Sequence, residues 1–300
     1  MTIAELVAPP RDVLERVRAA VEPPLRAALA GLPDETREVA EFALRQQDFS
    51  TAALVLLSAG AVGGTADVTG VATALELAAL HERLHSDLMA QEASARAEFG
   101  RGRVVAAADA LLCLAFARLS KPWVMILNIA LLSVVDGCVQ EIEMDERDDV
   151  DMAGYLGVAA AKHSALTAAA CEIGALAAGA SRSRAGHLRE FGDDIGLARK
   201  HVDDVLALHD DLAHRRRGLP VVAAMVAGVD VHGGASPRER ASLAEDGRKW
   251  CEQQAGLLLA RGLGHLRQAA LGEAEELAGL AEAVTTARCT PVVPPQPTGD

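Results

Sequence analysis

Four aspartates stand close together in the segment Leu197–Pro220, and their spacing suits metal chemistry. They are Asp203, Asp204, Asp210 and Asp211. On a helix, residues seven or eight positions apart share roughly one face, which places Asp211 near both Asp203 and Asp204. Clustered carboxylates suit Mg²⁺, which binds through one or two carboxylates together with substrate phosphates. A solvated acidic face is the alternative interpretation.

Basic residues follow the aspartates directly. Arg215, Arg216 and Arg217 form an unbroken run. Guanidinium groups bind phosphate oxygens in a forked geometry. Acidic residues for a metal and arginines for phosphate within one segment predict a diphosphate site.

Other polar residues lie inside apolar helical stretches. Asp87 is the only aspartate of "RLHSDLMAQEASAR", and Asp109 and Lys162 interrupt runs of alanine and leucine. A polar group on such a helix must be paired or must face a cavity, because burying it alone costs free energy. Asp109 and Lys162 therefore have structural pairing as the first interpretation and a cavity site as the second.

The composition predicts the elements that position these residues. The chain has 300 residues, of which 50% are hydrophobic and only 3% aromatic, so alanine, leucine and valine must build the core. Alanine and leucine are strong helix formers, and no alternating β-branched pattern predicts a strand. We expect one all-α domain over residues 1–289, with roughly ten or more helices around a central cavity, and a disordered Pro-rich tail over 290–300.

Charge and hydropathy exclude several classes of protein. The net charge of −13 argues against a nucleic-acid or anionic-membrane partner, since both require basic surfaces. The longest apolar run, Trp123–Val135, is too short to span a membrane and is predicted to be a buried core helix. We also place Val104–Leu119 and His163–Ala180 at the centre of the bundle. Five scattered cysteines and the absence of a signal-peptide pattern predict a cytoplasmic protein.

Several segments, in order, resemble the trans-isoprenyl diphosphate synthases of the polyprenyl synthetase family. Leu188–Asp211 resembles the second aspartate-rich motif with its lead-in, and Ala74–Met89 resembles the helix of the first motif. Further matches are Leu54–Gly64, Ala106–Ser120, Ala160–Ala180 and Arg215–Val222. The resemblance implies an all-α isoprenoid-synthase fold, an allylic diphosphate held between two aspartate-rich helices through Mg²⁺, and a helical dimer.

The resemblance assigns roles to particular residues. The metal ligands it implies are Asp87, Asp203, Asp204 and Asp211. The implied diphosphate ligands are Arg96, Lys162, Arg215, Arg216 and Arg217. Further cavity candidates are His85, Asp109, Gln140, Glu143 and Lys200.

The chain departs from the family pattern at all three sites. Ser86 and Ala90 stand where the first motif has aspartates, and Ala207 stands where the second has one. Asp48, Phe49 and Thr51 replace the family's lysine and arginines that bind isopentenyl diphosphate. Putting an acid where a diphosphate should bind replaces attraction with repulsion, so we do not expect ordinary use of isopentenyl diphosphate.

Two functions fit these departures. The first is a non-standard enzyme acting on an allylic prenyl diphosphate, either terpene synthase-like or an unusual prenyltransferase, with Mg²⁺-assisted loss of diphosphate. The second is an inactive or regulatory subunit of a heteromeric prenyl diphosphate synthase. A helical interaction protein outside prenyl chemistry fits the ordered matches least. We predict a homodimer, or a heterodimer with an intact synthase.

The residues upstream of the first motif bear on the pocket itself. In the family they form the floor of the prenyl shaft, and here they are Leu80, His81, Glu82 and Arg83. A charged floor is costly beneath a hydrocarbon tail. Either this face meets solvent or a dimer partner, or the pocket is not a simple shaft.

Overall fold

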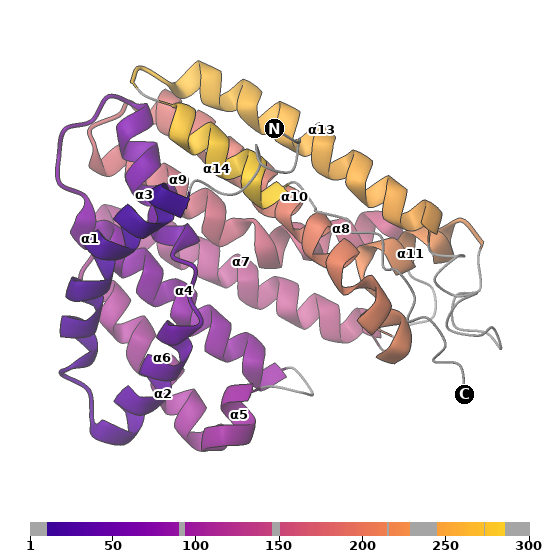
Figure 1. Cartoon of the computed structure of the whole chain (residues 1–300), viewed down its shortest axis with the longest axis horizontal. Coiled ribbons are helices and arrows are strands. Elements are labelled where there is room, and N and C mark those ends of the chain that lie inside the picture. Colours follow the sequence, from indigo (N-terminus) through magenta and orange to yellow (C-terminus); the bar gives the residue numbers. More distant parts are fainter. Residues whose placement is uncertain are drawn as a thin grey trace, which may run out of the picture.

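The computed structural model describes residues 11–89, 94–145, 151–214, 216–228, 245–272 and 274–285. Within these ranges the chain forms thirteen helices and no strand (Figure 1). The all-α prediction is therefore confirmed. The helices are α1 (Arg11–Leu29), α2 (Asp34–Arg45), α3 (Ser50–Ala61), α4 (Thr69–Met89), α5 (Ser94–Phe99), α6 (Arg101–Phe116), α7 (Lys121–Asp145), α8 (Met152–His163), α9 (Ala165–Ala177), α10 (Arg182–His214), α11 (Leu219–Val226), α13 (Glu245–Ala269) and α14 (Glu275–Thr285).

The core is built from small aliphatic side chains, as the composition predicts. One continuous cluster of buried residues runs from α1 through α4 and α9 to α14. α9 is buried over most of its length, which confirms its predicted central position. It packs against α3, α7 and α10. Alanine and glycine allow these helices to approach closely.

α10 organises the half of the molecule that carries the acidic segment. It is 33 residues long and packs along α13 on one side and α9 on another. Figure 1 shows α13 and α14 lying along it.

α7 differs from the prediction of a buried core helix. Met125, Ile129, Leu132, Val135, Val139 and Ile142 are all exposed, Ile129 by 64% and Leu132 by 60%. The apolar run also continues well beyond Val135, so Lys121–Met144 is long and apolar enough to cross a membrane by length and composition alone. A core helix can pass the same test. The sequence pattern could not show that the described part of the chain leaves one side of this helix uncovered.

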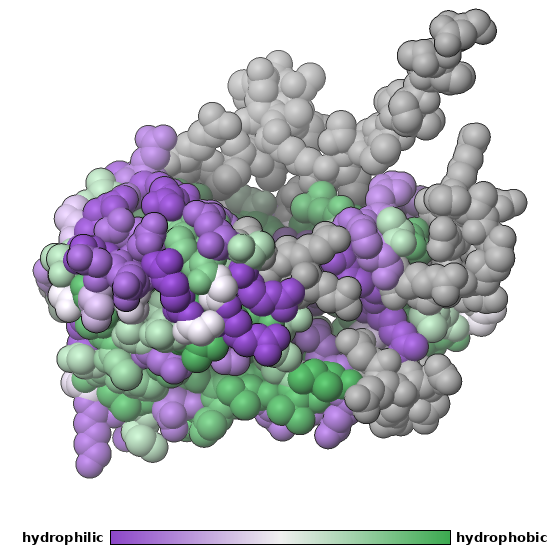
Figure 2. Space-filling model, turned by 90° about the horizontal axis from the view of Figure 1, so that it is seen from below, coloured by the Kyte–Doolittle hydropathy of each residue, from purple (hydrophilic) through white to green (hydrophobic). Residues whose placement is uncertain are grey.

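α6 was also predicted to be central and is only partly so. Val104, Ala107, Ala108, Leu111 and Ala115 are buried, while Val105 is 40% exposed. Figure 2 shows apolar surface gathered in a band along the lower edge of the molecule in that view.

Two other predictions concern the Pro-rich tail and the cysteines. The Pro-rich tail lies outside the described residues, so the predicted domain boundary at 289 stays a prediction. Among the described cysteines, Cys171 and Cys251 are buried, while Cys113 is exposed and Cys138 is half-buried. The four are free thiols.

The α3–α9 crossing gives a test of the close helix packing. A Cβ atom at Gly174 would lie 2.4 Å from the carbonyl oxygen of Val55, which is a backbone atom that cannot rotate away. We expect Gly174→Ala to lower the free energy of unfolding by about 1–3 kcal/mol, the usual cost of overpacking, as measured by urea denaturation.

Gly157 provides the matched control. It lies inside α8 and a Cβ there would meet no atom within 4 Å. Gly157→Ala should leave stability unchanged or raise it slightly, because alanine is the better helix former. Equal effects of the two substitutions would show that the Gly174 contact is not tight.

Candidate functional site

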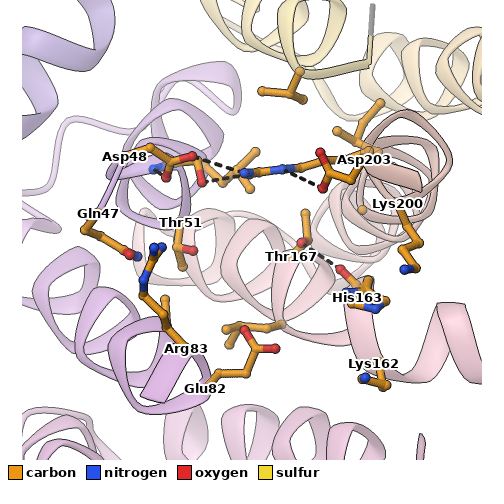
Figure 3. A pocket seen from close by; sticks show the side chains of 18 of the residues that line it. Gln47, Asp48, Thr51, Glu82, Arg83, Lys162, His163, Thr167, Lys200 and Asp203 are labelled. Carbon is orange, nitrogen blue, oxygen red and sulfur yellow. Dashed lines mark hydrogen bonds and ion pairs between the residues drawn. The ribbon is translucent and has the colours of Figure 1, made fainter. Parts of the chain in front are cut away.

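A cavity of about 380 Å³ lies among the α2–α3 loop and helices α4, α8, α9, α10 and α14. We call it the polar chamber. Its lining includes four cationic and three anionic side chains, namely Arg83, Lys162, Arg199, Lys200, Asp48, Glu82 and Asp203. Figure 3 shows Asp48 and Asp203 on one side of this space, with Lys162, His163 and Lys200 together on another. The chamber has the charge density of a site for a polyanion.

Arg199 joins two acidic residues across the chamber. Its NH2 lies 3.1 Å from Asp48 Oδ2, and its Nε lies 3.7 Å from Asp203 Oδ2. A third bond, of 3.1 Å, runs from Arg199 NH1 to Ser50 Oγ. Burial acts to raise the pKa of Asp48, but Arg199 and the Ser50 hydrogen bonds hold it below its usual value. The charge of Asp48 is thus balanced within the site.

The four aspartates predicted as metal ligands do not line one cavity. Asp203 lines the polar chamber. Asp204 instead accepts a 2.9 Å hydrogen bond from the Leu219 backbone nitrogen and a 2.6 Å bond from Lys200 Nζ. Successive residues of a helix point about 100° apart, so adjacent aspartates of α10 face different neighbours.

Asp211 shares its direction with Asp204 rather than with Asp203. A Cβ atom at Gly218 would lie 2.3 Å from Asp211 Oδ2 and 3.6 Å from Asp204 Cγ, so both carboxylates converge on the start of α11. Burial, and then the Asp204 charge, raise the pKa of Asp211 to about 6. Helix N-termini attract negative charge, which gives this pair a structural role at α11.

Asp87 and Arg96 hold α5 against the end of α4. Asp87 Oδ2 accepts a 3.4 Å hydrogen bond from the Ala95 backbone nitrogen, and Arg96 NH1 donates to the Leu88 carbonyl oxygen at 3.2 Å. Neither side chain lines the polar chamber, whereas Ser86 does. At the first motif, the position that faces the chamber is therefore the one that carries a serine.

The chamber's lysines are held by carboxylates at its edge. Lys162 Nζ lies 2.6 Å from Glu141 Oε2, and Lys200 Nζ binds Asp204. Burial raises the pKa of Glu82, although Lys162 and Arg199 partly offset the effect. Both lysines also line the chamber, so their positive charge acts on a ligand bound there.

A second cavity, of about 600 Å³, adjoins the first between α4, α6 and α7. We call it the apolar chamber. Most of its lining residues are apolar, and it shares Glu82, Ser86 and Lys162 with the polar chamber. His81 and His85 also line it. Glu82 and His81 thus lie in cavity walls, which favours the alternative that the pocket is not a simple shaft.

The remaining predicted residues fall in several places. Lys200 lines the polar chamber and His85 the apolar chamber. Gln140 bonds to Asp136, and Glu143 and Asp109 are exposed. Arg216 binds Asp211 and Asp210, and Arg217 donates to the Met144 carbonyl oxygen at 3.2 Å. Arg215 lies outside the described residues.

Sequence reasoning missed Glu141 and Arg199, although both contribute to the chambers. Glu141 lies between the predicted Gln140 and Glu143 and is the acid of that stretch that reaches Lys162. The only available signal for Arg199 was its position four residues before Asp203, on the same helical face. Motif matching passes over such a residue because it is not part of the motif.

The predicted magnesium site can be tested against these contacts. Of its four aspartates, Asp87, Asp204 and Asp211 bond or lie against backbone groups and basic side chains, and Asp203 lies beside Arg199. Mg²⁺ requires near-octahedral oxygen ligands. Of the four aspartates only Asp203 lines the polar chamber, and the magnesium site stays a prediction.

Comparisons with known proteins identify the family. A model described as "Polyprenyl synthetase" matches residues 53–219. The chain belongs to the polyprenyl synthetase family. It is 32% identical to a geranylgeranyl diphosphate synthase of Mycobacterium tuberculosis over 253 residues, which is 72% of each chain.

Other members of the family show the same relationship. A short chain isoprenyl diphosphate synthase of Methanothermobacter thermautotrophicus is 35% identical, but the match covers only 53% of each chain. The crystal structure of a polyprenyl synthetase from Streptomyces coelicolor superposes with a TM-score of 0.82 at 28% identity, covering 92% of this chain and 99% of that one. The isoprenoid-synthase fold expected from the sequence is thereby confirmed.

A buried carboxylate supports the loop that carries Asp48. Glu76 on α4 is fully buried, and its Oε2 accepts a 2.8 Å hydrogen bond from the Ala52 backbone nitrogen. Its Oε1 has no hydrogen-bond partner. Burial raises the pKa of Glu76 to about 7, although hydrogen bonds from Gln47 and Ala52 act in the opposite direction.

This raised pKa predicts a pH-dependent stability. Between pH 4.5 and 7 the folded chain binds a proton at Glu76 that the unfolded chain has released, so stability should fall as pH rises through this range. We expect Glu76→Gln to make that decline smaller, as measured by urea unfolding at pH 5, 6, 7 and 8.

The control is Glu98→Gln, which changes an exposed carboxylate on α5. It should leave the pH profile of the wild-type protein unchanged. If Glu76→Gln also runs parallel to the wild type, the Glu76 carboxyl is not the titrating group.

Proposed function

We propose that the protein binds an allylic prenyl diphosphate with its diphosphate in the polar chamber and its hydrocarbon tail in the apolar chamber. The observation that carries the proposal is the junction of the two cavities at Glu82, Ser86 and Lys162. An amphiphile with a polyanionic head and an apolar tail matches this pair of spaces. The family relationship supports the same class of ligand.

The proposed reaction is loss of diphosphate from the bound allylic substrate. Negative charge builds on the leaving diphosphate, and cations already in place stabilise it. Here Arg83, Lys162 and Lys200 supply that charge. Apolar side chains of the apolar chamber surround the tail, but Leu132, Val135 and Val139 in its wall are exposed, so this wall by itself does not exclude water from the allylic cation.

Ordinary condensation with isopentenyl diphosphate is not part of the proposal. Asp48 occupies a position where the family binds that diphosphate, and Arg199 is already engaged with Asp48 and Ser50. Phe49, at the next position, is completely buried. A second diphosphate would therefore meet the carboxylate of Asp48 at that position. Terpene synthase-like chemistry or transfer to a different acceptor fits better.

Mg²⁺ stays a prediction from the family resemblance. Asp203 and Glu82 are the carboxylates that line the polar chamber near the lysines. The assays below therefore include arms with Mg²⁺ and with EDTA.

Binding and turnover of C10, C15 and C20 prenyl diphosphates provide the test. We expect calorimetry to detect binding, with pyrophosphate released in the absence of isopentenyl diphosphate. Lys162→Ala should weaken binding by about 10-fold to 100-fold, since a hydrogen bond to a charged group contributes about 1.5–3 kcal/mol.

Lys121→Ala, which removes an exposed lysine at the start of α7, is the matched control and should bind like the wild type. Absence of binding to every prenyl diphosphate would refute the proposal as a whole. Binding without pyrophosphate release, with or without Mg²⁺, would refute only the proposed reaction.

A second candidate function is that of a non-catalytic subunit, and the exposed stripe on α7 favours it. The stripe consists of Met125, Ile129, Leu132, Val135, Val139 and Ile142. Their spacings of three and four residues place them along one helical face. Contiguous apolar surface of this kind marks an interaction site. In this candidate, the stripe packs against a second copy of the chain or against an intact synthase.

Mutation of the stripe tests this surface. We expect the wild-type protein to be a dimer by light scattering, and Ile129→Asp to produce monomers, because a charge would be buried in an apolar contact. Leu257→Asp on α13 is the control, since Leu257 is equally exposed but lies outside the stripe.

A monomeric wild-type protein would contradict self-association through α7. Co-purification of the wild type with an intact synthase, together with a changed product length, would then support the subunit candidate over the enzyme.

A further inference from the structure

A cluster of metal-binding residues lies on α10 and α13, outside both chambers. His187 and Glu190 lie three residues apart on α10, and His265 lies on α13. Residues three apart on a helix project from the same face, and that face of α10 meets α13 (Figure 1). None of the three lines the polar or the apolar chamber.

The ligand atoms of the three side chains converge. One such atom from each residue lies within 4.8 Å of the other two. His265 Nδ1 is 3.2 Å from Glu190 Oε2, and the rings of His187 and His265 are stacked with centroids 6.0 Å apart. Small side-chain rotations would bring two nitrogens and one oxygen to zinc-binding distance, about 2.0–2.2 Å.

A polar atom within the cluster is unsatisfied. His265 Nδ1 is shielded from solvent and makes no hydrogen bond, although Glu190 Oε2 is close. A cation held between these two atoms would give both of them a partner.

Asp194 lies behind His265, where metal sites commonly have a supporting carboxylate. Metal-bound histidines usually direct their other ring nitrogen toward such a group. Here His265 Nε2 is 4.0 Å from Asp194 Oδ2. Asp194 is buried and is held in place by Arg261, whose Nε lies 2.9 Å and 3.0 Å from its two oxygens.

We propose that His187, Glu190 and His265 bind one divalent transition-metal ion of the zinc type. Two imidazoles and one carboxylate suit Zn²⁺ and related ions better than Mg²⁺, which prefers oxygen ligands alone. Because Glu190 is exposed, the fourth position is open to water or to an outside ligand. The ion joins α13 to α10, the helix that carries Arg199, Lys200 and Asp203 into the polar chamber.

Metal titration of the full-length, tag-free and EDTA-stripped protein tests this site. We expect calorimetry to show one Zn²⁺ per chain, Co²⁺ to give a visible d–d absorption band on binding, and Mg²⁺ not to compete. Because the ion binds only the folded chain, Zn²⁺ should also raise the melting temperature.

Three variants separate this site from other metal-binding positions. Glu190→Gln changes an exposed side chain and should fold normally while weakening Zn²⁺ binding at least about tenfold, because outer partners alone are worth that much. His187→Ala combined with His265→Ala should abolish the Co²⁺ band and the thermal shift. His209→Ala, an exposed histidine elsewhere on α10, should change neither.

A wild-type protein that binds no Zn²⁺ would overturn the proposal. So would unchanged stoichiometry and affinity in Glu190→Gln and in the double variant, because the ion would then lie elsewhere. These outcomes are independent of prenyl diphosphate binding and of pyrophosphate release.

Discussion

The packing of α10 between α9 and α13 is the constraint on which the candidate site depends. Two covered sides leave one strip of the helix facing the polar chamber, and this strip carries Arg199 and Asp203. The side chains about 100° around the helix serve other contacts. Asp204 and Asp211 meet the start of α11, and Asp194 meets Arg261 on α13. The carboxylates of α10 therefore make three different sets of contacts.

Charge compensation explains how the chamber tolerates its unusual residues. Asp48 would repel a diphosphate if it were alone, yet Arg199 reaches it from α10 across 151 positions of sequence. Both side chains are partly exposed, so the pair is screened and contributes modestly to stability. The ion pair mainly affects the site, because Arg199 neutralises the charge of Asp48 and is itself engaged in that contact. The fold of the family is kept, and the polar chamber contains an ion pair between Asp48 and Arg199.

The two chambers and the α7 stripe together limit the possible functions. A polar cavity joined to an apolar one supports binding of an amphiphilic diphosphate, whatever follows binding. The stripe supports a helical partner, and four of its six residues also line the apolar chamber together with Lys162 and Glu141. Enzyme and subunit are thus compatible with one scaffold, and they differ in whether the cations of the polar chamber suffice to stabilise a departing diphosphate.

Much of the architecture could be predicted from the sequence. Alanine-rich and leucine-rich segments separated by glycine and proline determine helices, and the ordered motif matches from Leu54 to Val222 determine the family. The α9 helix, apolar on nearly every face, was correctly placed at the centre. These properties are local or cumulative along the chain, so a linear pattern suffices to establish them.

Only the tertiary structure decided which polar side chains meet. Asp87, a predicted metal ligand, accepts a hydrogen bond from the Ala95 backbone, while Glu141 and Arg199 reach the chambers without belonging to any motif. Likewise, the apolar run of α7 could not reveal that one face lacks a neighbour within the described chain. The physical reason is the same in each case. A residue's type and spacing determine its chemistry and its direction on a helix, but the partner it meets depends on how the helices pack.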